Sequence, residues 1–99
     1  MKKRIENITS ILKSELPILK SQYNVATLGV FGSFVRDEQT AKSDVDILVS
    51  FTKSPSLFKF LELEYHLSEL LDVKVDLVMK NSLKQNIGQR ILSEAQAII

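Results

Sequence analysis

Residues 32–46 read GSFVRDEQTAKSDVD, and this stretch decides how the rest of the chain is interpreted. It opens with the small pair Gly32-Ser33 and closes with two carboxylates, Asp44 and Asp46, one residue apart. Apolar runs flank it on both sides, as is typical of buried strands. The stretch therefore predicts a strand, a tight turn, a short helix, a loop and a second strand.

The carboxylates point to a metal site. Asp44 and Asp46 lie on one side of a predicted strand, about 7 Å apart along it. Two like charges on a strand built for burial are costly unless a cation neutralises them. Asp76 repeats the pattern one predicted strand later. If the two strands are neighbours, three carboxylates converge, and oxygen ligands of this kind suit Mg²⁺. Such a set can hold two metal ions about 4 Å apart for in-line phosphoryl displacement.

The start of the stretch is suited to binding phosphates. Gly32 lets the backbone approach a ligand closely. Ser33 places a hydroxyl and backbone N–H groups at a helix start, where anions bind. Arg36, one turn later, can hold a phosphate with two hydrogen bonds. Three further residues are phosphate-side candidates: Lys42, Ser43 and Lys74. The chemistry that fits both halves is nucleotidyl transfer from a nucleoside triphosphate held by Mg²⁺.

Each of these features has a plainer interpretation when taken alone. A Gly-Ser pair is then a turn, and an Asp-x-Asp pair is a solvated strand end. Arg36 is then a surface ion pair, and Asp76 is a charge that protects an edge strand from aggregation. The specificity lies in the ordered set, in which strand, Gly-Ser, Asp-x-Asp and a third Asp follow one another.

Three segments are predicted to be strands. They are short, apolar and rich in β-branched residues, and they cover residues 25–31, 44–51 and 73–79. In the third, Val75 faces one side with its apolar neighbours and Asp76 faces the other. Residues 95–99 are interpreted either as a closing strand or as a frayed end.

Helices are predicted around these strands. The first has residues 2–4 as its solvated start and carries apolar residues at helical spacing from Ile5. Pro17 should end or kink it near Leu16, because proline lacks the N–H that the helix needs. The other helices are predicted at residues 33–37, at 55–71 with Ser54 as N-cap, and from Ser82 onward. This alternation predicts an α/β (α+β) fold, a small mixed β-sheet with helices packed on it.

The helix after Ser54 carries a wide apolar stripe, formed by Leu57, Phe60, Leu61, Leu63, Leu67, Leu70 and Leu71. The solvent-exposed side of this helix is predicted to carry Lys59, Glu62 and Glu69. We interpret Phe51, Phe58 and Phe60 as core residues and not as a base-stacking platform. The single histidine, His66, has no metal-ligand partner at helical spacing, so we interpret it as structural or surface.

Composition narrows the class of protein. The chain of 99 residues predicts a single domain, residues 1–99, which buries roughly 60–70% of its unfolded surface. A net charge of +1 gives no electrostatic reason to expect direct nucleic-acid or membrane binding. No apolar run approaches membrane-spanning length. The chain has no cysteine, which excludes disulfides and thiolate metal sites and fits a cytoplasmic location.

The ordered motifs resemble a known family. The blocks LGVFGSFVR (28–36), SDVDILV (43–49) and LSELL followed by VDLV (67–71 and 75–78) resemble those of minimal nucleotidyltransferases of the polymerase-beta superfamily, which are encoded beside HEPN-domain ribonuclease toxins. The resemblance implies a polymerase-beta-like nucleotidyltransferase fold. It also implies that Gly32 and Ser33 hold phosphates, and that three carboxylates hold Mg²⁺: Asp44, Asp46 and Asp76.

The resemblance further implies a substrate and a partner. Similar proteins are antitoxins, of a type VII-like system, that transfer AMP from ATP onto a tyrosine of the partner HEPN toxin. Asp37 departs from the family, which often has glycine there, and it either alters triphosphate binding or faces solvent.

Two rival functions stay open at this point. One is a binding module that masks the toxin without chemistry, and the other is nucleotidyl transfer to a small molecule. The sequence leaves open the acceptor residue, the number of AMP units, the base preference, and whether the protein forms a homo- or a hetero-oligomer.

Overall fold

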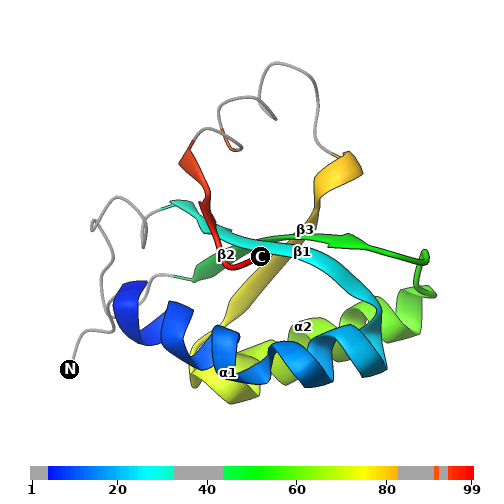
Figure 1. Cartoon of the computed structure of the whole chain (residues 1–99), viewed down its shortest axis with the longest axis horizontal. Coiled ribbons are helices and arrows are strands. Elements are labelled where there is room, and N and C mark those ends of the chain that lie inside the picture. Colours follow the sequence, from blue (N-terminus) through cyan, green and yellow to red (C-terminus); the bar gives the residue numbers. More distant parts are fainter. Residues whose placement is uncertain (1–4, 33–43, 83–90, 92–93) are drawn as a thin grey trace.

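The computed structural model describes residues 5–32, 44–82, 91 and 94–99. In this part of the chain, two helices cover one face of a four-stranded mixed sheet, and the C-terminal segment forms one of its edge strands (Figure 1). The elements in chain order are α1 (Ile5–Tyr23), β1 (Val25–Phe31), β2 (Val45–Phe51), α2 (Leu57–Leu71), β3 (Val75–Met79), the short 3₁₀ helix η2 (Lys80–Ser82) and β4 (Gln96–Ala97). The predicted fold class is confirmed.

The sheet has the strand order β3-β2-β1-β4. β1 pairs with β2 in antiparallel fashion, and β2 pairs with β3 in parallel. A parallel pair needs a long crossover connection, and α2 supplies it. β4 pairs with β1 in antiparallel fashion, with Gly29 opposite Ala97. The C-terminal segment is therefore a closing strand and not a frayed end.

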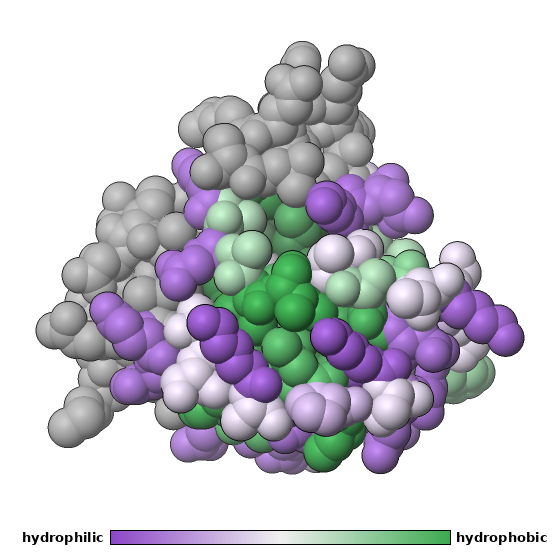
Figure 2. Space-filling view, in the orientation of Figure 1, coloured by the Kyte–Doolittle hydropathy of each residue, from purple (hydrophilic) through white to green (hydrophobic). Residues whose placement is uncertain are grey.

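The core lies between the sheet and the two helices. Val45, Ile47 and Val49 of β2 are fully buried there, as one face of a strand should be. The same cluster draws apolar residues from both helices and from the neighbouring strands: Ile8, Leu12, Leu19, Leu28, Val30, Leu63, Leu67, Leu71, Val75 and Leu77. Burial stabilises the fold by about 1.5–3 kcal/mol for each such side chain. On the face of the molecule that Figure 2 shows, hydrophobic residues gather in the middle, with hydrophilic residues around them.

α1 continues through Pro17 to Tyr23. Of the two effects predicted for Pro17, an end or a kink near Leu16, the end is wrong. Pro17 lies on the exposed side of the helix, where water can satisfy the carbonyl that loses its N–H partner. The turns beyond it bury Leu19 and Tyr23, which are 0% and 7% exposed. This burial outweighs the cost of the proline. The helix is followed by Asn24, which adopts a left-handed φ of 58°.

α2 begins two residues later than predicted. Its N-cap is Ser56, whose Oγ accepts a hydrogen bond from the backbone N–H of Lys59 at 3.2 Å. Ser54 lies outside the helix. The predicted end at Leu71 is confirmed, because Asp72 adopts a left-handed φ of 53° and its N–H bonds back to the carbonyl of Ser68.

The outer edge of β3 is protected by side chains of α2. The backbone N–H of Val75 donates to Ser68 Oγ at 3.0 Å, and that of Leu77 donates to Glu64 Oε2 at 2.9 Å. An edge strand with unpaired N–H groups invites pairing with another chain. These two side chains therefore accept hydrogen bonds from two outward N–H groups of β3 and join the crossover helix to the sheet.

Polar and aromatic contacts join the two helices. His66 Nε2 lies 3.2 Å from Glu15 Oε1, and its ring stacks on Tyr23 with centroids 5.8 Å apart. Lys59 Nζ lies 5.1 Å from the centroid of the Tyr23 ring. The pKa of Tyr23 is raised, first by burial and then by the charge of Glu62, although Lys59 acts in the opposite direction. His66 thus has a structural place between the helices, in agreement with its interpretation from sequence.

In the part of the chain that the structure describes, no helix is both long and apolar enough to cross a membrane.

Candidate active site

The face of the sheet that the helices leave open carries two of the predicted carboxylates. In β2, residues alternate between the two faces, so Asp46 faces away from the core to which Val45 and Ile47 belong. In β3, Asp76 is exposed between two buried neighbours. The parallel register pairs Asp46 directly with Asp76. Side chains of directly paired residues lie on the same face of a sheet, so these two carboxylates are neighbours across adjacent strands.

Gly32 connects the first motif to these carboxylates. It follows the last residue of β1 and has a φ of +83°, a conformation that favours glycine. A Cβ built on Gly32 would overlap with the carboxylate of Asp46, whose Cγ would be only 3.1 Å away. The backbone at the end of β1 therefore lies directly against Asp46, and only glycine leaves room for this contact.

Asp44 stands just before β2, at the same end of the sheet. Its Oδ2 lies 3.8 Å from Nζ of Lys74, in an ion pair that is open to solvent. The carbonyl of Lys74 accepts a hydrogen bond from the backbone N–H of Val45 at 2.9 Å. The structure thus brings Lys74, which the sequence placed among the phosphate-side candidates, next to one of the predicted metal ligands.

The carboxylates fit a magnesium ion through their chemistry. Mg²⁺ is commonly bound by one or two carboxylates together with substrate phosphates and water. The register pair of Asp46 and Asp76 supplies two such ligands from adjacent strands. Among the described residues, no three His, Cys, Asp or Glu side chains form a group that could hold a metal ion. The structure therefore places Asp46 and Asp76 side by side, and the metal site of three carboxylates stays a prediction.

Several predicted site residues lie outside the described residues. They are Ser33, Arg36, Asp37, Lys42 and Ser43. The structure thus places Gly32 and the carboxylates, while the phosphate-binding roles of Ser33, Arg36 and Ser43 stay predictions.

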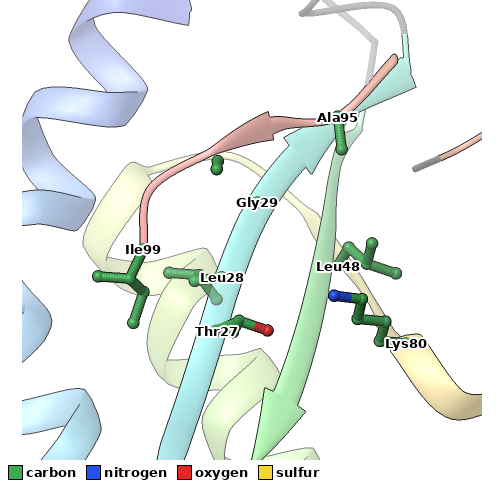
Figure 3. Close-up of a pocket in the computed structure, with 8 residues that line it drawn as sticks. Thr27, Leu28, Gly29, Leu48, Lys80, Ala95 and Ile99 are labelled. Carbon is green, nitrogen blue, oxygen red and sulfur yellow. The ribbon is translucent and has the colours of Figure 1, made fainter. Parts of the chain in front are cut away.

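A hollow of about 160 Å³ lies close to the carboxylates. Leu48 and Gly29, which are register partners, belong to its lining and lie on the same face of the sheet as Asp46. Figure 3 shows Lys80 beside Leu48 on one side of the strands and Ile99 on the other. Leu48 is two residues from Asp46, about 7 Å along the strand. A ligand held at the carboxylates can therefore reach this hollow.

Sequence reasoning missed the hollow because its lining comes from four separate parts of the chain. The full lining consists of Thr27, Leu28, Gly29, Leu48, Lys80, Ala95, Ala97 and Ile99. Its one local signal is Gly29 within β1, because glycine in a strand often marks a close approach of another segment. A Cβ on Gly29 would lie 3.4 Å from the carbonyl oxygen of Gln96.

Comparisons with known proteins show the family of the chain. Residues 12–98 match the sequence model of the nucleotidyltransferase domain family. The protein adenylyltransferase MntA of Thermococcus cleftensis is 51% identical over 91% of this chain and 91% of its own length. A solved structure assigned as a minimal nucleotidyltransferase superposes with a TM-score of 0.79, at 29% identity, over 95% of both chains.

A more distant likeness concerns a complex from Shewanella oneidensis, of a tri-AMPylated HEPN toxin with its MNT antitoxin. It matches with a TM-score of 0.66 at 20% identity, over 92% of this chain and 71% of that chain. At this identity, the likeness supports the fold.

Proposed function

Since the chain belongs to the nucleotidyltransferase domain family, we propose that it is an antitoxin that transfers AMP from ATP onto a tyrosine of a HEPN-domain toxin, with Mg²⁺ as cofactor. The observation that carries this proposal is the register pair of Asp46 and Asp76 beside Gly32. The chain is a nucleotidyltransferase by family. The 51% identical relative is a protein adenylyltransferase, which favours a protein as acceptor.

The HEPN partner rests on the resemblance of the three sequence blocks. The Shewanella complex, which shares the fold, contains a toxin of that class modified with AMP. These observations favour a HEPN toxin as the acceptor, because it is the class of protein found with an antitoxin of this fold.

In the proposed transfer, the tyrosine oxygen forms a bond to the α-phosphorus of ATP, and the bond from that phosphorus to pyrophosphate breaks. The proton of the tyrosine hydroxyl must leave. Asp76 is exposed on the open face, so one of its carboxylate oxygens can accept this proton. Asp46 is half-buried next to Gly32.

Mg²⁺ would be held by Asp46 and Asp76, with Asp44 as the third predicted ligand. When bound, it neutralises charge on the phosphates during the transfer. Gly32 brings backbone close to the phosphates, and we assign Ser33, Arg36 and Ser43 to phosphate binding on the basis of the sequence. Lys74, already beside Asp44, can supply a further positive charge on the phosphate side.

The test is the intact mass of the HEPN partner after incubation with this protein, ATP and Mg²⁺. A gain of one or more AMP units is expected with the wild-type protein. The gain should disappear with the double variant Asp46→Asn and Asp76→Asn. Asp72→Asn is the matched control, because Asp72 is an exposed aspartate whose left-handed φ asparagine also tolerates.

The outcome also decides between the proposal and its rival. An unchanged mass with the wild-type protein, together with a stable complex and protection from the toxin, would contradict AMP transfer and favour steric masking. A mass gain that persists in the double variant would contradict the assigned residues and not the activity.

A further inference from the structure

The open face of the sheet is arranged in three rows that cross the strands. Residues that pair in the register share a face, and so do residues two apart along one strand. The first row is Asp76, Asp46 and Phe31; the second is Val78, Leu48, Gly29 and Ala97; the third is Ser50 and Thr27. Neighbouring rows lie about 7 Å apart along the strands. A ligand that extends from the carboxylates along the strands therefore meets an apolar row first and a polar row second.

The hollow of about 160 Å³ lies over the second row. Leu48, Gly29 and Ala97 all belong to its lining. Leu48 is 5% exposed although it lies on the open face, so this part of the face is shielded from water. An apolar cavity of about 150 Å³ can hold an aromatic ring such as benzene. The hollow thus has the size and the surface that suit a flat aromatic group.

Polar groups stand at the edge of the hollow that is remote from the carboxylates. The hydroxyls of Thr27 and Ser50 are hydrogen-bonded to each other across β1 and β2. Lys80, which follows β3 directly, lines the same hollow as Thr27. Figure 3 shows the nitrogen end of Lys80 and the hydroxyl end of Thr27 pointing toward each other. Lys80 also lines a neighbouring hollow of about 190 Å³, to which Ser50 belongs. One ammonium and two hydroxyls therefore meet at this edge.

Two aromatic groups of the proposed reaction are candidates for the hollow: the ring of the acceptor tyrosine and the base of the nucleotide. The tyrosine hydroxyl must face the α-phosphorus, so its ring would turn only carbon atoms toward Lys80 and Thr27. A nucleobase is joined to the phosphates through its sugar and carries hydrogen-bonding atoms on its outer edge. An apolar row followed by a polar row matches the base and not the tyrosine ring.

We propose that the hollow binds the purine base of the nucleoside triphosphate, with Lys80 and the hydroxyls of Thr27 and Ser50 at the outer edge of the base. The inference rests on the proposed function, because it takes the phosphates to be held at Asp46 and Asp76. One sugar ring separates a base from its α-phosphate, and this suits the distance of about 7 Å between the first two rows. Binding sites for small molecules are commonly apolar, with a few polar groups that fix orientation.

This placement predicts a preference for purines over pyrimidines. The Lys80 ammonium can only donate hydrogen bonds, and ring nitrogens of a purine accept them. The hydroxyls of Thr27 and Ser50 can also accept a hydrogen bond, as the amino group of adenine requires. A single pyrimidine ring ends closer to the sugar and leaves these groups without a partner, which opposes its binding. ATP should therefore bind about tenfold more tightly than CTP or UTP.

Calorimetric titration without an acceptor protein separates the base from the phosphates. The ligands are ATP and inorganic tripolyphosphate, each with Mg²⁺. Lys80→Met keeps the length of the side chain and removes its charge. It should weaken ATP binding about tenfold and leave tripolyphosphate binding unchanged, because Lys80 lies beyond the apolar row. Lys74→Met is the matched control. Lys74 stands beside Asp44, so its loss should weaken the binding of both ligands.

A second pair of variants fills the hollow without removing a charge. Ala97→Leu places a larger side chain over the second row, whereas Gln96→Leu adds the same side chain to the neighbouring residue of β4, which points to the other face. Both residues are exposed, so neither change overpacks the core, and thermal unfolding checks that both variants fold. Ala97→Leu should weaken ATP binding about tenfold and bring ATP and CTP to within about twofold of each other. Gln96→Leu should bind both nucleotides like the wild type.

Three results would overturn the inference. The first is equal binding of ATP and CTP by the wild-type protein. The second is a loss of tripolyphosphate binding in Lys80→Met as large as its loss of ATP binding. The third is normal ATP binding by Lys80→Met and Ala97→Leu together with a higher KM for the HEPN partner, which would assign the hollow to the acceptor. Purine-selective binding without any AMP transfer to the partner would instead contradict the proposed function and support the base site.

Discussion

The two faces of the sheet differ in what they do, although the same strands form both. On the helix side, Val45, Ile47 and Val49 are fully buried and hold the fold together. On the open side, Asp46 and Asp76 stand next to each other at the end of the first strand, where Gly32 lies. Because side chains alternate along a strand, the packing that stabilises the fold and the chemistry that we propose lie on opposite faces. Substitutions on the two faces should therefore have separable effects.

The largest expected effect is on the helix side. Leu67→Ala should lower the free energy of unfolding by about 3 kcal/mol, because Leu67 is fully buried and its truncation leaves a cavity. Urea denaturation measures this loss. Leu61 lies on the same helix, and its side chain is 48% exposed. Leu61→Ala should therefore lower the free energy of unfolding by less than about 1 kcal/mol. Similar losses for the two variants would break the distinction between the inner and outer sides of α2.

The second largest effect is expected on the face of the sheet that the helices leave open. Gly32→Ala should slow AMP transfer about a hundredfold, because the added Cβ forces the carboxylate of Asp46 to move and the φ of +83° disfavours alanine. Initial rates of toxin modification measure it. Gly29→Ala, whose Cβ would meet only ordinary contacts from 3.4 Å outward, should leave the fold nearly unchanged. A Gly32→Ala enzyme of full activity would show that this contact is not needed.

A smaller effect is expected at the edge of the sheet. Ser68→Ala should cost about 1–2 kcal/mol of stability, because the N–H of Val75 loses its acceptor. Thermal unfolding can detect the change. Ser21→Ala provides the comparison, because Ser21 Oγ only donates back to the exposed helix carbonyl of Ile18 at 3.4 Å. If both substitutions have the same small effect, the hydroxyl of Ser68 does not support β3.

The smallest effect concerns pH and the contact between the helices. The pKa of Tyr23 is raised above 10.0 by burial and by Glu62, so the folded protein disfavours the phenolate. Its contribution to stability is full below pH 10 and is lost as the pH rises above that value. Tyr23→Phe should flatten this alkaline decline in the unfolding free energy, because phenylalanine has no proton to lose. An unchanged decline would assign it to other groups.

The sequence pattern correctly predicted those helix and strand bounds that depend on neighbouring residues alone. The bounds of β1 and the end of α2 agree with the sequence, because apolar runs and turn residues define them. The alternation of β3 also placed Asp76 on the face opposite to Val75, as observed. The register that pairs Asp46 with Asp76 depends on how two distant strands pair. From the sequence, the carboxylates could therefore be predicted to converge only if the two strands were neighbours.

The predictions that were wrong concern segments in which tertiary packing overrides the local preference of the sequence. Pro17 does not end α1, because Leu19 and Tyr23 bury the turns that follow it. In α2, the apolar pattern is wider than the surface that the sheet can cover. Leu57 and Leu61 belong to the predicted apolar stripe and are nevertheless exposed.

The phenylalanine cluster divides in the same way. Phe51 and Phe60 meet edge to face with centroids 6.4 Å apart. Phe58, predicted as a member of the same core cluster, is 87% exposed. Sequence periodicity identifies which residues are apolar on a helix, but the width of the partner surface decides which of them are buried.

The central claim is that the open face transfers AMP and not phosphate. It is tested most directly by incubating the protein and its HEPN partner with ATP labelled either at the α-phosphate or at the γ-phosphate. We expect label on the partner only from α-labelled ATP, with the γ-label released in pyrophosphate, and no label with Asp46→Asn and Asp76→Asn. Transfer of the γ-label, or no transfer from either ATP while the partner is still neutralised, would contradict the account.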